Sequence, residues 1–321
     1  MGSAEDLLVV RVARKTAETD AISAFELVHP RGADLPAFTA GAHLDVHLPN
    51  GLVRQYSLCN DERERHRYVI AVLRDPRSRG GSAAMHDAVH VGHELRVSAP
   101  RNHFPLAQAG QAPLLLAGGV GITPLLSMAR RLAREGLPYA LHYFARTRAA
   151  IAFLRELSAP PFAGRVSFHL DDQPGVSLPL ADVLDSAAVH RPVYVCGPGG
   201  FIDAALDLAR ARGWQEDRLH CERFAAGPSA APAGSFEVRI ASSGQTLFVP
   251  AGKSALQVLR EHGLDVPFSC EQGVCGTCLT PVLDGKPDHR DAYLTPAERA
   301  LNDCFAPCCS RSLTPVLVLG L

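Results

Sequence analysis

Residues 270–278 read Cys-Glu-Gln-Gly-Val-Cys-Gly-Thr-Cys, and a later cysteine, Cys308, begins the stretch Cys-Cys-Ser-Arg. The spacing C-x4-C-x2-C followed by a distant fourth cysteine is typical of plant-type [2Fe–2S] proteins, in which four thiolates hold two irons. Gly273 and Gly276 let the backbone of such a loop approach a cluster closely. We therefore expect the metal ligands to be Cys270, Cys275, Cys278 and Cys308.

Two alternatives compete with this interpretation of the cysteines. A zinc ribbon usually shows paired C-x2-C arms, and this sequence has a single arm of that kind. Buried structural cysteines would need no fixed spacing. The fourth ligand stays open between neighbours, because Cys304 and Cys309 lie close to Cys308 in the sequence.

Composition describes an ordinary globular protein of two or three domains. The chain has 321 residues, 47% of them hydrophobic and 20% charged, with a formal net charge of −1. That balance excludes an electrostatic preference for nucleic acid or an anionic membrane surface. Nine cysteines without a signal-peptide pattern favour a reducing compartment. The most apolar stretch, 114–126, is interrupted by glycines and a proline, so we expect a cytoplasmic protein without a membrane span.

The first part of the chain, to about residue 105, reads as strands. His43–Leu48 alternates with period two, and residues 68–73 and 94–97 are short β-rich runs between turn signals. This density of short strands favours an antiparallel barrel or sandwich.

From about residue 112 strands alternate with helices. Apolar strands at 113–117, 139–144 and 193–195 are followed by helical patterns at 124–135 and 201–212. Such alternation predicts a parallel α/β sheet.

An Ala/Pro/Gly/Ser stretch at 225–235 is the clearest linker. Beyond it a hairpin around Ser243-Gly244, a helix capped by Ser254 and a late strand at 315–319 predict a small α+β domain. The expected domain bounds are 1–105, 106–225, a linker at 226–235, and 236–321.

Arg54-Gln55-Tyr56-Ser57-Leu58 is the second informative motif. An arginine at a strand edge can hold a phosphate, and a tyrosine two residues on lies on the same face and can pack against a flat ring. The Ser57 hydroxyl offers a hydrogen bond. An ordinary exposed strand would explain this pentapeptide equally well if it stood alone.

Two glycine-rich turns follow strands of the α/β region. In Gly118-Gly119-Val120-Gly121-Ile122-Thr123-Pro124 the glycines permit a diphosphate to approach a helix start, with Thr123 as N-cap and Pro124 as the first helical residue. The third glycine of the dinucleotide fingerprint is absent. Cys196-Gly-Pro-Gly-Gly ends the later strand, where ligands of open α/β sheets bind. Alone, Cys196 fits a buried small hydrophobe.

Taken together, these motifs resemble the phthalate dioxygenase reductase family within the ferredoxin–NADP reductase superfamily. The resemblance covers essentially the whole chain. It implies an antiparallel β-barrel flavin domain, an α/β parallel-sheet nicotinamide domain and an α+β (β-grasp) plant-type ferredoxin domain. The reductase portion fused to self-sufficient cytochromes P450 carries similar Arg-Gln-Tyr-Ser-Leu-Cys and Cys-Cys-Ser-Arg stretches.

The resemblance also implies cofactors and their residues. The flavin is expected to be FMN, bound by Arg54, Gln55, Tyr56, Ser57, Ala71, Val72, Leu73, Arg79, Gly80, Gly81 and Ser82. The nicotinamide nucleotide is expected at Gly119, Gly121, Thr123, Arg146, Asp171, Cys196, Gly197, Pro198 and Phe224. An acidic residue near a ribose, Asp171 or Asp172, favours NADH, whereas Arg146 and Arg148 offer a site for the extra phosphate of NADPH.

The expected activity is that of an NADH-dependent FMN and iron–sulfur oxidoreductase that passes electrons to a separate oxygenase, with no general acid–base residue assigned. A Rieske oxygenase or O-demethylase is the expected partner of a monomer, and a cytochrome P450 is the alternative. Two hypotheses of other classes are a ferredoxin-type carrier without reductase activity and a thiol switch built on Cys304, Cys308 and Cys309.

Overall fold

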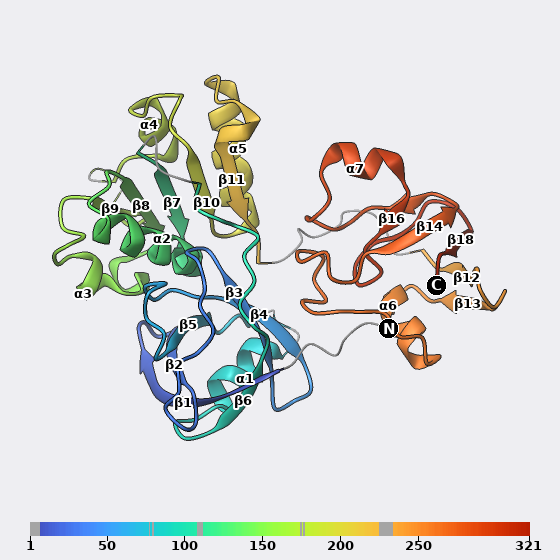
Figure 1. Cartoon of the computed structure of the whole chain (residues 1–321). Coiled ribbons are helices and arrows are strands. Elements are labelled where there is room, and N and C mark those ends of the chain that lie inside the picture. The colour runs from blue at the N-terminus through green and yellow to red at the C-terminus, as the bar shows by residue number, and fades with distance from the viewer. Residues whose placement is uncertain are drawn as a thin grey trace. The chain divides into compact units, whose positions relative to one another are not determined.

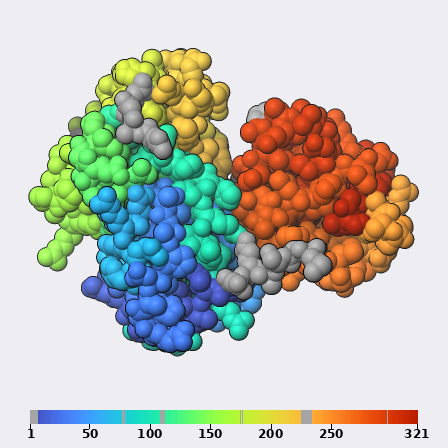
Figure 2. Space-filling model, in the orientation of Figure 1, coloured from blue at the N-terminus to red at the C-terminus, as the bar shows by residue number. Residues whose placement is uncertain are grey.

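The computed structural model describes residues 7–76, 78, 80–107, 112–173, 175, 177–224 and 234–321 (Figure 1). Arg79 and most of the expected linker, 225–233, lie outside the described residues. The chain divides into two compact units, residues 1–222 and 223–321. Figure 2 shows one face of the surface, with the first unit in blue to yellow and the second in orange to red.

The first sheet of the first unit is an antiparallel barrel. Its strand order is β4-β3-β6-β1-β2-β5. The two strands at the ends of that order meet, because Leu58 bridges Ile70 and the Cys59 N–H donates to the Val69 carbonyl at 2.9 Å. This closure shows that the sheet is a barrel and not a sandwich. A closed barrel has no free sheet edges. The strands are β1 (Leu8–Ala17), β2 (Ile22–Val28), β3 (His43–His47), β4 (Val53–Ser57), β5 (Tyr68–Leu73) and β6 (Glu94–Val97).

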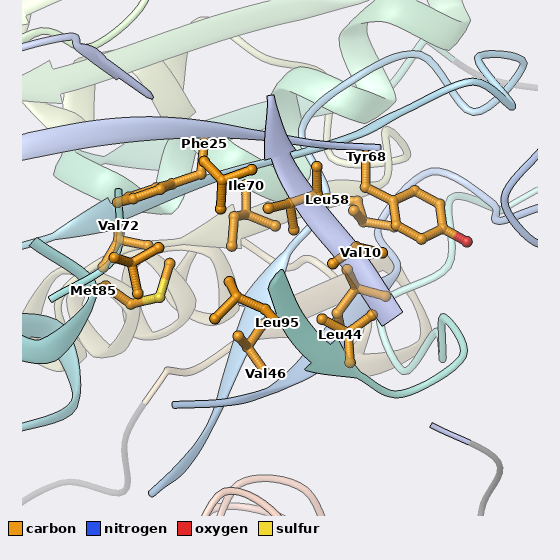
Figure 3. Packing of buried hydrophobic residues seen from close by; sticks show 14 of the residues in the cluster. Val10, Phe25, Leu44, Val46, Leu58, Tyr68, Ile70, Val72, Met85 and Leu95 are labelled. Atoms are coloured by element: carbon orange, nitrogen blue, oxygen red, sulfur yellow. The ribbon is translucent and has the colours of Figure 1, made fainter. Parts of the chain in front are cut away.

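Alternate residues of these strands fill the barrel. Figure 3 shows apolar side chains from several strands pointing toward one another, with Met85 added by helix α1 (Gly81–Asp87). Fully burying one such side chain contributes about 1.5–3 kcal/mol, so this packing fixes the frame from which β4 presents its motif. The labelled residues are Val10, Phe25, Leu44, Val46, Leu58, Tyr68, Ile70, Val72, Met85 and Leu95.

The second sheet of the same unit is parallel throughout, in the order β11-β10-β7-β8-β9. The chain leaves β7 for β8 on one side and returns as β10 on the other, so the strand order reverses between β7 and β10. Crevices at such reversals are where open α/β sheets bind ligands. The strands are β7 (Leu114–Gly118), β8 (Ala140–Ala145), β9 (Val166–Leu170), β10 (Val193–Cys196) and β11 (Leu219–Glu222).

Helices connect these strands, and one of them begins earlier than the sequence predicted. Helix α2 starts at Ile122 with Gly121 in the N-cap position, so Thr123 and Pro124 lie inside its first turn. The Thr123 hydroxyl donates to the Val120 carbonyl at 3.0 Å instead of capping. A short 3₁₀ turn ahead of α2 moves the helix start. The elements are η1 (Gly119–Gly121), α2 (Ile122–Arg134), η2 (Arg148–Ala150), α3 (Leu154–Leu157), α4 (Leu180–Asp185), α5 (Gly199–Ala211) and η3 (Glu216–Arg218).

The barrel and the parallel sheet are joined where β4 ends. The Ser127 hydroxyl of α2 donates to the Asn60 carbonyl at 2.9 Å, and Arg130 donates to the Cys59 carbonyl. Both acceptors lie just beyond Ser57, so helix α2 fixes the end of β4 relative to the parallel sheet.

The second unit is an α+β domain, as expected. Its sheet runs β13-β12-β18-β14-β16, with β12 and β18 parallel. Ser254 forms a capping box with Gln257 at the start of α6, which confirms the predicted cap. The elements are β12 (Phe236–Ile240), β13 (Thr246–Val249), α6 (Ala255–Glu261), β14 (Thr280–Asp284), β15 (Pro287–Asp288), α7 (Pro296–Leu301), β16 (Cys304–Phe305), β17 (Arg311–Ser312) and β18 (Val316–Leu319).

Among the helices of the described ranges, none combines the length and the apolar character needed to cross a bilayer.

Candidate cofactor sites

Three of the expected metal ligands lie in the loop between α6 and β14, and Cys308 follows β16. All four side chains are buried. The thiols of Cys270 and Cys275 are in hydrogen-bonding contact, and so are those of Cys278 and Cys308. The four cysteines therefore form two pairs, and the Cys308 thiol also contacts that of Cys309.

The loop geometry requires its glycines. Gly273 and Gly276 have φ of 72° and 70°, a region that favours glycine. A Cβ on Gly273 would lie 2.4 Å from Cys309 Sγ, and one on Gly276 would lie 2.4 Å from the Tyr293 ring. The loop also turns a backbone donor toward sulfur, since the Gln272 N–H donates to Cys270 Sγ at 3.3 Å.

This arrangement fits a two-iron cluster. Two irons need two thiolates each, and the two pairs of thiols supply that number. Contact with the Cys270 thiol, with further hydrogen bonds, lowers the pKa of Cys275 and favours its thiolate. Cys304 lies on β16 and Cys309 packs against Gly273.

Arg54, the first of the expected flavin residues of β4, lies beside the start of α1. Arg54 is buried, and a Cβ on Gly81 would lie 2.8 Å from Arg54 Cγ and 2.9 Å from its Nε. Gly80 is the N-cap of α1 with φ of 91°. The guanidinium side chain thus passes across backbone that only glycine permits, which fits a phosphate group. The Ser82 hydroxyl bonds within the preceding turn, to Ser78 at 2.9 Å.

The remaining flavin candidates divide between two faces. Tyr56 is half-buried against the barrel core, and burial raises the pKa of its hydroxyl. Gln55 points to the opposite face of β4, where its amide donates to Asp45 at 3.0 Å. Ala71 and Val72 are buried in β5, whereas Leu73 is exposed.

A polar contact joins the barrel to the parallel sheet. The Ser57 hydroxyl donates to Glu222 Oε2 at 2.9 Å, across 165 residues of sequence. Cys196 is the register partner of Glu222 on the neighbouring strand. Burial raises the pKa of Glu222 to about 7, opposed by the Ser57 hydrogen bond. Burial, with the nearby Glu222 charge, also raises the pKa of Cys196, so this thiol stays neutral.

The two glycine-rich turns pack directly on each other. A Cβ on Gly121 would lie 2.2 Å from the Cys196 carbonyl oxygen, and one on Gly197 would lie 3.0 Å from Gly118 Cα. Pro198 is the N-cap of α5 and sits beside Gly118. Gly119 has φ of 55° and open space around it. These turns lie side by side at the reversal of strand order.

Arg146 and Asp171 lie at the carboxyl ends of β8 and β9. Both are exposed, and the two segments are joined by the Asp172 N–H, which donates to the Arg146 carbonyl at 3.1 Å. The structure therefore brings these two candidates to the same edge as the glycine turns. Phe224 follows β11 and belongs to the second unit.

Glu222 was not among the individually expected site residues, although the family resemblance implies an acidic residue beside the flavin in this stretch of the sequence. It lies in His220-Cys221-Glu222-Arg223-Phe224, at the end of the last strand of the parallel sheet. The available signal was its position at a carboxyl strand end; its contact with Ser57 depends on tertiary folding.

Comparison with known proteins agrees with this architecture. The model of the 2Fe-2S iron-sulfur cluster binding domain matches residues 238–313. A vanillate O-demethylase oxidoreductase of Pseudomonas putida is 52% identical over 97% of this chain and 98% of its own length. The solved phthalate dioxygenase reductase is 41% identical, covers 98% of both chains and superposes with a TM-score of 0.81. An intact self-sufficient cytochrome P450 monooxygenase matches 98% of this chain, but only 41% of its own, with 37% identity and a TM-score of 0.80.

A barrel, a parallel nucleotide-binding sheet and a ferredoxin domain define a pyridine-nucleotide reductase that uses a flavin and an iron–sulfur cluster. The chain belongs to the phthalate dioxygenase reductase family. It is an oxidoreductase whose cofactors are FMN, NADH and a [2Fe–2S] cluster, and its relatives are named as oxidoreductases or reductases of oxygenase and demethylase systems.

Proposed function

We propose that this chain is the reductase of an O-demethylase system whose oxygenase is of the Rieske type and acts on a methoxylated aromatic acid. The observation that supports this choice is the 52% identity to a vanillate O-demethylase oxidoreductase over nearly the full length of both chains. The likeness to a P450-fused reductase extends to less than half of that protein. This chain acts as a cytoplasmic monomer in the proposal.

The site residues have the following proposed roles. Arg54 and the glycine backbone at the start of α1 hold the FMN phosphate, because a buried guanidinium beside N–H groups suits an anion. Tyr56 packs against the flavin ring. When bound, NADH supplies a hydride to FMN, which releases electrons singly to the cluster.

Ser57, Cys196 and Glu222 line the place where the nicotinamide meets the flavin in this proposal. The Ser57 hydroxyl orients Glu222 through its hydrogen bond to Oε2. With its pKa raised to about 7 by burial, Glu222 holds a proton on its carboxyl group in part of the molecules near neutral pH. The neutral Cys196 thiol gives an apolar wall that excludes water.

The proposed domain bounds are those expected from the sequence, with flavin-binding residues 1–105, nucleotide-binding residues 106–225, a linker at 226–235 and the ferredoxin domain at 236–321. The three larger sheets, which lie within residues 8–97, 114–222 and 236–319, support this division. Cys270, Cys275, Cys278 and Cys308 hold the cluster in the proposal, supported by their arrangement in two pairs.

Reconstitution tests the proposal. The purified reductase is mixed with NADH, vanillate and the oxygenase component of a vanillate O-demethylase, and formaldehyde release is measured. We expect formaldehyde only in the complete mixture, and little NADH consumption by the reductase alone. Parallel mixtures contain a phthalate oxygenase with phthalate, or a P450 with its substrate. Faster turnover in either of these would assign the chain to a different partner.

A further inference from the structure

One carboxyl group of the second unit is buried beside the cluster loop. Asp291 lies between β15 and α7, and its side chain has 0% exposure. Burying a charge is costly unless hydrogen bonds compensate. Here Oδ2 accepts the N–H groups of Tyr293 at 3.1 Å and Leu294 at 2.8 Å, and Oδ1 accepts from the Ser310 hydroxyl at 3.4 Å.

These contacts link Asp291 to both segments that carry the proposed ligands. On one side, the Ala292 N–H donates to the Gly273 carbonyl at 2.8 Å, and a Cβ on Gly273 would lie 3.1 Å from Asp291 Cα. Gly273 stands between the ligands Cys270 and Cys275. On the other side, Ser310 lies two residues after Cys308. Asp291 therefore joins the three-cysteine loop to the segment of the fourth cysteine.

Among the described residues, Arg299 and His289 lie near the Asp291 carboxylate, and Arg299 also donates to the Asp291 backbone carbonyl. Arg299 Nη2 is 3.8 Å from Oδ2, and its side chain is 35% exposed. His289 Nδ1 is 3.8 Å from Oδ1. Arg290, the adjacent residue, pairs with Asp288 at 2.6 Å. A buried negative charge acts strongly at short range because low dielectric screens it little.

We propose that Asp291 is a positioning residue for the cluster. It holds the Cys308 segment against the 270–278 loop, and its negative charge makes the cluster harder to reduce. The inference rests on the proposed ligand set. Asp291 thereby sets how readily the cluster receives an electron from the flavin and passes it to the oxygenase.

Asp291→Asn tests whether the negative charge of Asp291 makes the cluster harder to reduce. Asparagine has nearly the same shape, its oxygen can accept the Tyr293 and Leu294 N–H groups, and its amide can donate to Ser310. We expect a tenfold shift of the cluster equilibrium toward the reduced form, which is a rise of 59 mV for a one-electron couple. The measurement is a redox titration followed by visible absorbance and electron paramagnetic resonance. Asp284→Asn, the loss of an exposed carboxylate in the same unit, is the matched control and should leave the potential unchanged.

Arg299→Gln gives the opposite test. Loss of the partly exposed cation beside Asp291 should shift the equilibrium about threefold toward the oxidised form, a smaller effect because solvent screens this group. If Asp291→Asn fails to retain iron, the potential of Arg299→Gln still tests whether charge at this position affects reduction of the cluster. An unchanged potential in every iron-replete variant would overturn this effect of charge.

Ser310→Ala tests the mechanical part. It keeps the Asp291 charge but removes the hydroxyl link to the Cys308 segment. We expect faster iron loss to a chelator at an unchanged potential. Iron loss equal to that of the unaltered protein would refute the positioning role. Complete cluster retention in Cys308→Ser would instead show that the ligand assignment had failed, which separates the two outcomes.

Discussion

The cluster loop and the proposed flavin–nicotinamide site are built in opposite ways. Three proposed ligands lie within nine consecutive residues, 270–278, and local backbone geometry aims their sulfurs. The contact between Ser57 and Glu222 joins residues 165 positions apart and exists only because the barrel and the parallel sheet are fixed to each other. Local loop geometry therefore positions three of the proposed ligands, whereas packing between two sheets brings Ser57 and Glu222 together.

This difference has an energetic side. Left-handed glycines shape the cluster loop. Asp291, Tyr293 and Cys309, which come from farther along the chain, pack against these glycines. The flavin–nicotinamide site depends on contacts between sheets, including the donors from α2 to the residues after β4. A substitution at one site should therefore affect the rest of the molecule differently from a substitution at the other.

Replacing a proposed ligand is the change with the largest expected effect. Cys308→Ser removes one thiolate of the Cys278–Cys308 pair, so we expect loss of the iron–sulfur absorbance. Reduction of ferricyanide by NADH should persist, because the first unit is compact by itself. Visible spectra, iron analysis and the ferricyanide assay measure both results.

Cys304→Ser and Cys309→Ser are the matched controls for this change. Each removes a neighbouring thiol outside the two pairs, so each variant should retain the cluster. Loss of the cluster in Cys309→Ser would give the fourth position to that residue. Loss of flavin binding in Cys308→Ser would contradict the independence of the two sites.

Glu222→Gln should change how stability depends on pH. Burial raises the pKa of Glu222 to about 7 from an ordinary 4.5, so the folded state holds a proton that the unfolded state has lost between these values. Stability from this group is full below about pH 4.5 and falls by about 3 kcal/mol as pH rises through 7. The variant should therefore gain stability relative to the unaltered protein across this range.

Denaturant unfolding at several pH values from 5 to 8, with flavin bound, measures that gain. The exposed Glu237 supplies the control, since Glu237→Gln makes the same chemical change at an exposed position. If the difference in unfolding free energy between Glu222→Gln and the unaltered protein does not change with pH, the carboxyl group of Glu222 is not held protonated by burial.

Gly121→Ala probes the contact between the glycine turns. Its Cβ would lie 2.2 Å from the Cys196 carbonyl oxygen, and relief of such overpacking costs about 1–3 kcal/mol. We expect lower stability and a raised KM for NADH. Gly200→Ala, in α5 with no atom within 4 Å of the added Cβ, should be neutral or slightly stabilising. Equal behaviour of the two variants would show that the turns can separate freely.

The same contrast, between a local loop and contacts that are distant in sequence, explains how far each site could be predicted from the sequence. The cysteine spacing and the glycines at 273 and 276 are local, so the cluster loop could be predicted without a structure. The start of α2 could not be predicted, because the 3₁₀ turn at 119–121 makes Gly121 the N-cap residue in place of Thr123. Glu222 could not be linked to Ser57 because no pattern within a strand encodes a partner on another sheet. Asp291 was missed because its role depends on burial between two ligand segments.

The smallest expected effect concerns the choice of dinucleotide at the carboxyl ends of β8 and β9. Arg146 and Asp171 are exposed there side by side, so a carboxylate that suits a ribose lies near a cation that suits a phosphate. We expect NADH to be preferred, and Asp171→Asn to narrow the preference by about tenfold in kcat/KM, which is about 1.4 kcal/mol. Steady-state assays with NADH and NADPH, with ferricyanide as acceptor, measure the ratio. Arg146→Gln should widen the preference, because it removes a cation near the extra phosphate of NADPH. A preference of the unaltered protein for NADPH by more than tenfold would make Arg146 the dominant group, and it would place nucleotide choice beyond what a carboxylate at a strand end can predict.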